Sequence, residues 1–259
     1  LVGLAGGELT GYSFFFQNLD KNLGEPNIPV WQRWGMPADE FYSPVLATGD
    51  LNNDGLSDLL IGAYDGYLYA FRNIQYSVNG KIFTTWAREA SWDPKDSNGK
   101  SIDFGYSAAP ALGDLNGDKV LDLVVGSDAK GIRAFKNTGS QTPNSSPSWS
   151  EQPQALSTID GNFSSTAPAL GDVNGDDKLD LFIGLIGGTD GGKTFAYLYD
   201  SSLSTWQYEK SLDPIKVEAT ARPAFADLDN NGLIDLFIGQ YGYYDYAQKT
   251  VALQNKGDQ

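Results

Sequence analysis

Apolar and polar residues alternate over short runs along the whole chain, and these runs recur in a fixed order. Each cycle begins near a Pro and holds an apolar run, a polar loop, a second apolar run and an alternating run, and in every copy except the last a run with a Trp follows. Alternation with a period of two predicts strands with one buried face. No window of about eleven or more residues has a persuasive helical period. The pattern therefore predicts an all-β protein.

Four copies of the cycle align along the chain. They read PVLATGDLNNDGLSDLLIG from Pro44, PALGDLNGDKVLDLVVG from Pro110, PALGDVNGDDKLDLFIG from Pro168 and PAFADLDNNGLIDLFIG from Pro223. A unit of roughly 55–64 residues with four short strands is typical of a β-propeller blade. A β-solenoid or a β-sandwich is the alternative, although a sandwich would not need the same loop four times. We predict a β-propeller of four-stranded antiparallel blades, with four to five blades present.

The repeats divide the single domain, residues 1–259, into five units. These are a partial blade (1–35), three blades (36–95, 96–153 and 154–212) and a second partial blade (213–259). The first unit matches strands two to four of a blade, and the last matches strands one to three, so the two do not complement each other. Because an open arc would leave strand edges exposed, we expect a piece of a larger, seven-bladed type of propeller. A compact five-bladed ring is the alternative.

The loop between the first two strands of each copy carries the candidate chemistry. In the first copy, a nine-residue segment has oxygen side chains at positions 1, 3, 5 and 9, namely Asp50, Asn52, Asp54 and Asp58, and Leu56 at position 7 can offer its carbonyl. Calcium takes about six to eight oxygen ligands in a flexible cage, and crowded carboxylates repel one another unless a cation lies among them. Asx-rich turns without a metal are the alternative.

The other three loops repeat this arrangement, so the sequence predicts up to four calcium ions. Their candidate ligands are Asp114, Asn116, Asp118, Val120 and Asp122; Asp172, Asn174, Asp176, Lys178 and Asp180; and Asp227, Asp229, Asn231, Leu233 and Asp235. Lys119 and Asp177 stand at position 6, where the first and fourth loops have Gly. Since that position often needs a positive φ, we expect weaker binding in the second and third loops.

The amino-acid composition excludes several classes of partner and of catalytic site. The 259 residues include 33 Asp and Glu against 18 Lys and Arg, a net charge of −15, which disfavours a nucleic-acid partner. Twelve of those carboxylates are candidate calcium ligands, so much of the charge belongs to the loops. Cys and His are absent, which excludes disulfides, thiolate nucleophiles and His-dependent catalysis. No apolar run is long enough to form a membrane-spanning helix.

Two further motifs have simpler interpretations. Residues 187–194, GGTDGGKT, match a phosphate-binding loop, but an alternating strand follows where that site needs a helix. We interpret the segment as a Gly-rich hairpin. Trp31, Trp86, Trp149 and Trp206 recur in phase and are expected to pack between blades. Trp34 and Trp92 fall outside the repeat and are expected to be freer to lie at the surface.

The D-x-[DN]-x-[DN]-G-x-x-D loops, set among apolar-Gly strand ends, resemble the FG-GAP/VCBS repeat family over nearly the whole chain. This family includes the calcium-loop blades of integrin α-chain propellers and of many secreted bacterial and fungal proteins. The resemblance implies that the loops bind calcium structurally, and that the chain is secreted or displayed at a cell surface, in an extracellular or periplasmic setting. It also implies adhesion-like or lectin-like roles. Lys119 and Asp177 depart from the family pattern.

Blade geometry then predicts a ligand face. Loops that join strands one and two all emerge on one face, so turns between strands two and three lie on the other. Candidate ligand-binding residues in those turns are Tyr64, Tyr67, Tyr241, Tyr243 and Tyr244. Aromatic side chains beside Asp and Asn suit stacking on sugars or gripping a protein. The linkers between blades add Phe41, Tyr42, Tyr106 and Phe163.

Three functions follow from the sequence. The first is a calcium-binding extracellular module that recognises a glycan or a protein. The second is a propeller domain of a polysaccharide-processing enzyme, for which no carboxylate pair can be singled out. The third is a structural subunit of a surface assembly, joined through its end blades. An enzyme is the less favoured reading, and no catalytic residue is named.

Overall fold

The structure is a computed structural model of the whole chain. It describes residues 2–3, 13–18, 31–34, 41–157, 159, 163, 165–186, 192–212, 215–217, 220–239 and 250–257. The helical segments among these residues are the short 3-10 turns η1 (Ala90–Trp92), η2 (Pro153–Leu156) and η3 (Lys210–Leu212). Within this described part, no helix has the length and apolar character needed to cross a membrane.

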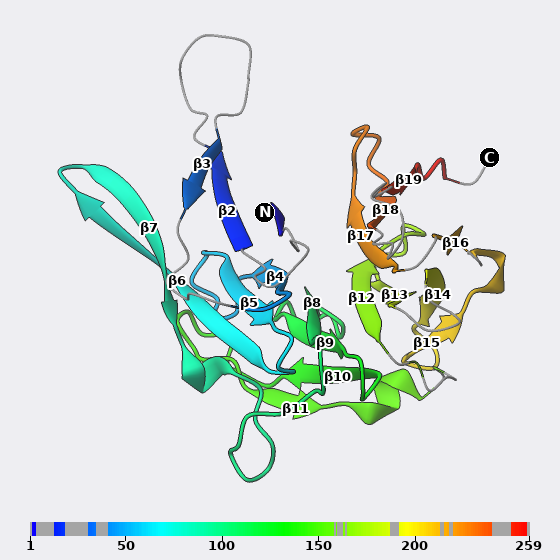
Figure 1. Cartoon of the computed structure of the whole chain (residues 1–259), viewed down its shortest axis with the longest axis horizontal. Helices are drawn as coiled ribbons and strands as arrows, with labels where there is room; N and C mark the ends of the chain where they lie inside the picture. Colours follow the sequence, from blue (N-terminus) through cyan, green and yellow to red (C-terminus); the bar gives the residue numbers. More distant parts are fainter. Residues whose placement is uncertain are drawn as a thin grey trace.

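Five antiparallel sheets follow one another along the chain (Figure 1). The first holds β1 (Val2–Gly3), β2 (Ser13–Asn18) and β3 (Trp31–Trp34). The second holds β4 (Val45–Gly49), β5 (Asp58–Gly62), β6 (Leu68–Val78) and β7 (Lys81–Arg88). The third holds β8 (Ala109–Gly113), β9 (Asp122–Gly126), β10 (Ile132–Asn137) and β11 (Trp149–Glu151).

The fourth sheet holds β12 (Thr166–Gly171), β13 (Asp180–Leu185), β14 (Lys193–Asp200) and β15 (Thr205–Tyr208), with β16 (Ile215–Lys216) paired to β14. The fifth holds β17 (Arg222–Ala226), β18 (Asp235–Gly239) and β19 (Val251–Leu253). Strands that are consecutive in the chain pair within each sheet, and the first strands β4, β8, β12 and β17 contact one another in succession. This is the predicted all-β propeller architecture, which the structure confirms.

The hydrophobic core lies between neighbouring sheets. Leu123 and Val125 of β9 pack towards the second sheet, against Leu60 and Leu68, whereas Val124 packs with the fourth sheet. Phe182 and Ala196 of the fourth sheet pack in turn with Leu236 and Ile238 of the fifth. All five residues of β5 and of β9 are buried, and β9 has a neighbouring sheet on both of its faces. This explains why the second run of each repeat is continuously apolar.

Two of the in-phase tryptophans pack between sheets, as predicted. Trp206 is only 1% exposed and donates its Nε1 proton to the carbonyl of Leu179 at 2.8 Å. Trp149 packs against the cluster of the second and third sheets and donates to the carbonyl of Trp92 at 2.8 Å.

The surface position expected for Trp92 is wrong, because its side chain is 3% exposed. It follows β7 in the turn η1, which brings it into the cluster that contains Phe104 and Phe135. Trp34, for which the same was expected, has no described side chain.

In three sheets, the Gly at or next to the end of the second strand sets the spacing to the following sheet. A Cβ built on Gly126 would lie 2.3 Å from the carbonyl oxygen of Thr166 and 2.7 Å from Cδ of Pro168 on the next sheet. Gly62 and Gly184 meet the following linker and the repeat's Pro in the same way, at 2.0 and 2.2 Å from a carbonyl oxygen. A side chain at these positions would push neighbouring sheets apart. The apolar-Gly signature of the repeat is therefore a packing requirement.

We predict that Gly126→Ala lowers the free energy of unfolding by about 1–3 kcal/mol, because an added methyl group overpacks a close backbone contact. Gly239→Ala is the matched control, since among the described residues the nearest atom to a Cβ there is the Arg222 carbonyl oxygen, 3.8 Å away. Urea unfolding of both variants measures the difference. Equal losses in the two variants would show that the close approach is unimportant.

Candidate functional site

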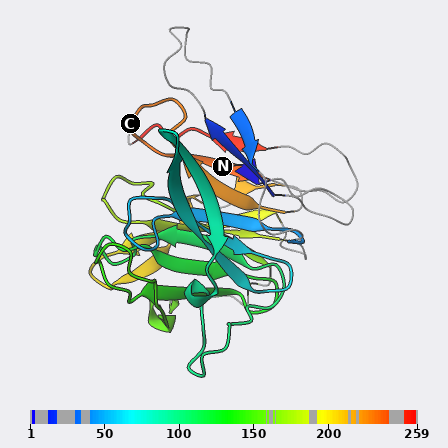
Figure 2. The ribbon, with the colours of Figure 1, turned by 90° about the vertical axis from the view of Figure 1, so that its left-hand side faces the viewer.

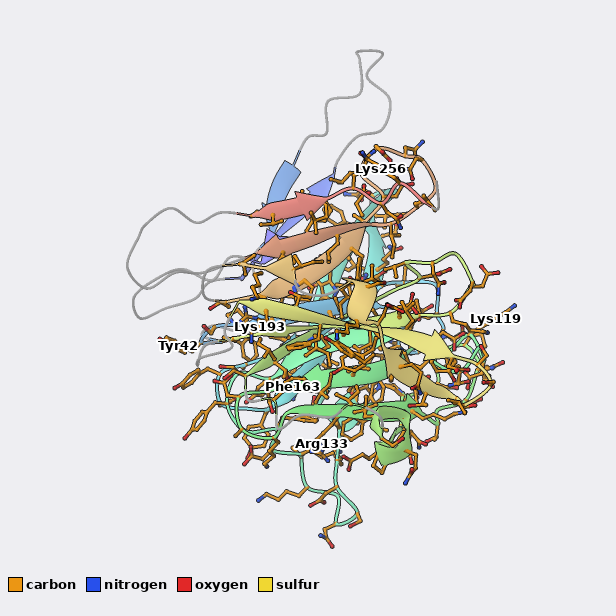
Figure 3. All side chains as sticks on the ribbon, turned by 90° about the vertical axis from the view of Figure 1, so that its right-hand side faces the viewer. Tyr42, Lys119, Arg133, Phe163, Lys193 and Lys256 are labelled. Atoms are coloured by element: carbon orange, nitrogen blue, oxygen red, sulfur yellow. The ribbon has the colours of Figure 1, made fainter. Side chains whose placement is uncertain are left out.

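The four predicted metal loops occupy equivalent places in four sheets. They join β4 to β5, β8 to β9, β12 to β13 and β17 to β18. In Figure 3, Lys119 of the second loop and Lys256 beside the fourth lie at one edge of the disc, and Tyr42 lies at the opposite edge. This placement agrees with the sequence expectation that the loops share one face.

The first carboxylate of each loop organises its backbone. Asp114 accepts N–H groups from Gly117 and Asp118 on one oxygen, at 2.7 and 3.1 Å, and from Lys119 on the other, at 2.8 Å. The same bonds from positions 5 and 6 reach Asp50, Asp172 and Asp227, at 2.7–3.1 Å. Because the chain curls around this carboxylate, the side chains at positions 3 and 5 are drawn into the same small loop.

The side chain at position 5 also accepts a hydrogen bond from the backbone of its own loop. One oxygen of Asp54, Asp118, Asp176 and Asn231 accepts the N–H of position 7 at 2.8–3.0 Å. In three loops the position 3 side chain accepts the N–H of position 5, at 3.0–3.2 Å, with Asn52, Asn174 and Asp229 as acceptors.

The Asp at position 9 closes each loop from the inside. Asp58, Asp122, Asp180 and Asp235 are each at most 3% exposed. One oxygen accepts the N–H of position 2 at 3.0–3.1 Å. The other accepts an N–H from the third strand or its end, donated by Asn73, Asn137, Tyr199 and Asn255 at 2.8–2.9 Å. Each of these carboxylates therefore ties its loop to the third strand of its own sheet.

Burial alters the acidity of these carboxyls. Desolvation raises the pKa of Asp58 to about 6, and the charges of Asp54 and Asp50 add to the rise, although the N–H groups of Asn73 and Leu51 oppose it. Desolvation raises the pKa of Asp180 to about 6 in the same way, and that of Asp122 also rises. A nearby cation would favour the ionised form.

The second and third loops, which lack Gly at position 6, have a Gly at position 4 instead. Lys119 and Asp177 adopt a φ of +66° and +61°, beside Gly117 and Gly175 at position 4, where φ is +80° and +78°. The first and fourth loops reverse the order: Asn53 and Asn230 have a φ of +57° and +58°, and Gly55 and Gly232 +84° and +87°. The expected positive φ at position 6 is confirmed. All four loops keep the same turn with one Gly each, so the missing Gly is not by itself a reason for weaker binding.

The loops differ in what neutralises their carboxylates. Arg72 lies 3.4 Å from Asp54, and Lys136 lies 3.2 Å from Asp118, each reaching from the third strand of its sheet. Leu198 occupies the equivalent position in the fourth sheet, and in the fifth Gln254 donates a hydrogen bond to Asp229. The first two loops thus have a basic side chain that competes with a bound cation, whereas the third and fourth have a neutral one there.

Carboxylates gather most closely in the fourth loop. Oxygens of Asp227, Asp229 and Asp235, at positions 1, 3 and 9, lie within 4.8 Å of one another, the one such group among the described residues. In the other loops Asn replaces Asp at position 3. The donor set is oxygen throughout, which fits a hard cation such as calcium.

The opposite face carries a row of exposed tyrosines. The ring of Tyr64 lies 5.1 Å from that of Tyr42 and 5.4 Å from that of Tyr106, between ring centroids. These side chains are 44%, 47% and 58% exposed. The backbone holds them in place, since Tyr64 N–H donates to the Tyr42 carbonyl and Ser107 N–H donates to the Tyr64 carbonyl.

The predicted ligand residues are thus placed only in part. Tyr67 is half-buried beside Tyr64, while Tyr241, Tyr243 and Tyr244 lie outside the described residues. Tyr42 and Tyr106, named in the sequence only as linker aromatics, complete the exposed row. Phe41 and Phe163 are half-buried and pack on Tyr69 and Phe195.

Comparisons with known proteins agree with this geometry. The sequence profile described as FG-GAP-like repeat matches residues 50–125 and again residues 114–183, together more than half of the chain. The chain is also 30% identical over 173 residues to integrin alpha-8 of Gallus gallus, a match that covers 61% of this chain. The chain spans 16% of the length of that integrin relative. The chain belongs to the FG-GAP-like repeat family.

Proposed function

We propose that this chain is a calcium-stabilised binding module of the adhesion type, which acts outside the cell and takes a protein or glycan ligand on the face opposite its loops. The observation that carries the proposal is the fourfold repetition of one oxygen-lined loop, down to the same hydrogen bonds. Similarity to an integrin α-chain supports an extracellular setting and a protein ligand. The exposed tyrosine row supports the position of the ligand.

Calcium is proposed for each loop, with up to four ions. The side chains at positions 1, 3, 5 and 9 and the carbonyl of position 7 would hold the ion, which supplies the positive charge that balances them. At about 1 mM calcium and a Kd of about 10 µM, binding would add roughly 2.7 kcal/mol per site. Several such sites together would match the stability of an ordinary domain. The ions are therefore proposed to maintain the fold rather than to catalyse a reaction.

We predict that Asp118→Asn weakens one calcium site about tenfold or more, because it removes a ligand charge and retains an oxygen that can accept from Val120 N–H. Asp96→Asn is the matched control: Asp96 also caps a turn, by accepting N–H groups from Asn98 and Lys100, but lies outside the four loops. Isothermal titration calorimetry of metal-free protein compares them. The same loss of affinity in both variants would contradict the assignment.

We also predict opposite pH dependences with and without calcium. The raised pKa values of Asp58 and Asp180 mean that the metal-free fold gains stability from these groups below about pH 4 and loses it as pH rises through about 6. Calcium needs the ionised carboxylates, so its stabilisation should grow over the same interval. Thermal unfolding between pH 4.5 and 7, in metal-free buffer and in 2 mM calcium, tests this. Parallel curves would refute it.

For the ligand face, we predict that Tyr64→Ala abolishes ligand binding, because Tyr64 is the central ring of the exposed row. Leu203→Ala is the control, since Leu203 is also exposed, at 62%, but lies in the turn between β14 and β15. A glycan array and a panel of purified extracellular-matrix proteins, both in 2 mM calcium, identify the ligand. Equal binding by both variants would place the ligand elsewhere.

A further inference from the structure

The β6–β7 hairpin is longer than the sheet that carries it. Strand β5 pairs with β6 only through Leu68–Phe71, but β6 and β7 stay paired as far as Val78 and Lys81. Asn79 and Gly80 form the turn with a φ of +51° and +77°, the two positive values that a tight type I′ hairpin requires. The resulting two-stranded ribbon projects away from the other sheets in Figure 1 and lies in front of them in Figure 2.

One face of this ribbon carries four exposed apolar side chains. Ile74, Tyr76 and Val78 alternate onto the same face, and Phe83 joins them because it is the register partner of Tyr76. Their exposed fractions are 39%, 49%, 47% and 40%, and the Tyr76 and Phe83 rings stack with centroids 5.6 Å apart. A two-stranded ribbon is marginally stable alone, and a contiguous exposed apolar patch marks an interaction surface.

Charge indicates which partner fits. Residues 66–88 are the longest stretch of the chain without Asp or Glu, in a protein of net charge −15. Arg72 and Arg88, at the base of the ribbon, are already paired with Asp54 and Asp93. Two copies of the chain would repel each other through their acidic bodies. The ribbon offers contact without carboxylates, and its tip reaches about 20 Å beyond the end of β5 pairing, farther than the Debye length of about 8 Å in physiological salt.

We propose that the ribbon is a self-association surface, through which two copies pack the faces formed by Ile74, Tyr76, Val78 and Phe83 against each other about a two-fold axis. A two-fold contact uses the same patch on both copies, and this patch is its own apolar complement. A lipid bilayer fits less well, because the ribbon beyond β5 has open strand edges whose backbone groups would be unsatisfied in hydrocarbon. The small area predicts a weak dimer, with a Kd in the micromolar range.

Sedimentation equilibrium from about 1 to 200 µM protein tests the proposal. We expect a reversible dimer that strengthens with added salt, since salt screens repulsion between the bodies. Phe83→Glu should weaken dimerisation at least tenfold, and so should a variant in which Asn-Gly replaces residues 75–84 and joins the register pair Ile74 and Thr85. Leu203→Glu, in the exposed β14–β15 turn at 62% exposure, is the control and should dimerise like the native chain.

Three results would overturn the inference. One is a native chain that stays monomeric at 200 µM. Another is unchanged dimerisation of both ribbon variants, which would place the contact elsewhere. The third is cosedimentation of the native chain, but not the shortened variant, with vesicles of phosphatidylserine and phosphatidylcholine in the absence of dimerisation. Far-ultraviolet circular dichroism checks that each variant is folded, and none of these outcomes depends on the calcium or ligand proposals.

Discussion

The structure depends on a buried carboxylate that bonds in two directions. In each of four sheets, the Asp at position 9 accepts one N–H from its loop and one from the third strand or its end. These two bonds fix the loop over the end of the sheet. The arrangement confines a negative charge at a nearly dry site beside other carboxylates, which costs free energy unless a cation or a proton compensates for it. Loop shape and a need for positive charge therefore arise from one interaction.

The repeat also places the acidic loops and the exposed tyrosines on opposite faces of the molecule. The apolar-Gly strand end and the following Pro bring adjacent sheets into contact, so that Leu, Val and Ile of the second strands are buried on both faces. Antiparallel connections then place the acidic loops on one side and the Tyr64 row on the other. A metal that stabilises one face can thus leave the other free for a ligand.

Much of the fold and of the loop structure was predictable, because the residues that determine them recur in every copy of the repeat. The four Asp-rich loops, the strand order and the packing of Trp149 and Trp206 follow from residues that recur in phase. Features that occur once were missed: Trp92 is buried through the local turn η1, and the extension of β6 beyond Asn73 breaks the pattern of the other sheets. The Asn79–Gly80 pair between alternating runs was a readable signal for that hairpin.

The loops show a different limit of sequence reasoning. A missing Gly at position 6 indicated a weaker site, but Gly at position 4 supplies an equivalent turn. The basic partners of Asp54 and Asp118 come from the third strand, more than a dozen residues away in sequence, so no local motif could reveal them. Differences between the four loops arise from tertiary neighbours, whereas their common shape arises from local spacing.

The most direct measurement is a crystal structure of the protein grown with 2 mM calcium, with anomalous diffraction recorded at a wavelength where calcium scatters strongly. The account predicts an anomalous peak in each of the four loops, with oxygens of positions 1, 3, 5, 7 and 9 at about 2.3–2.6 Å. Four ordered loops that hold no calcium, with the same hydrogen bonds to the position 9 Asp, would contradict it.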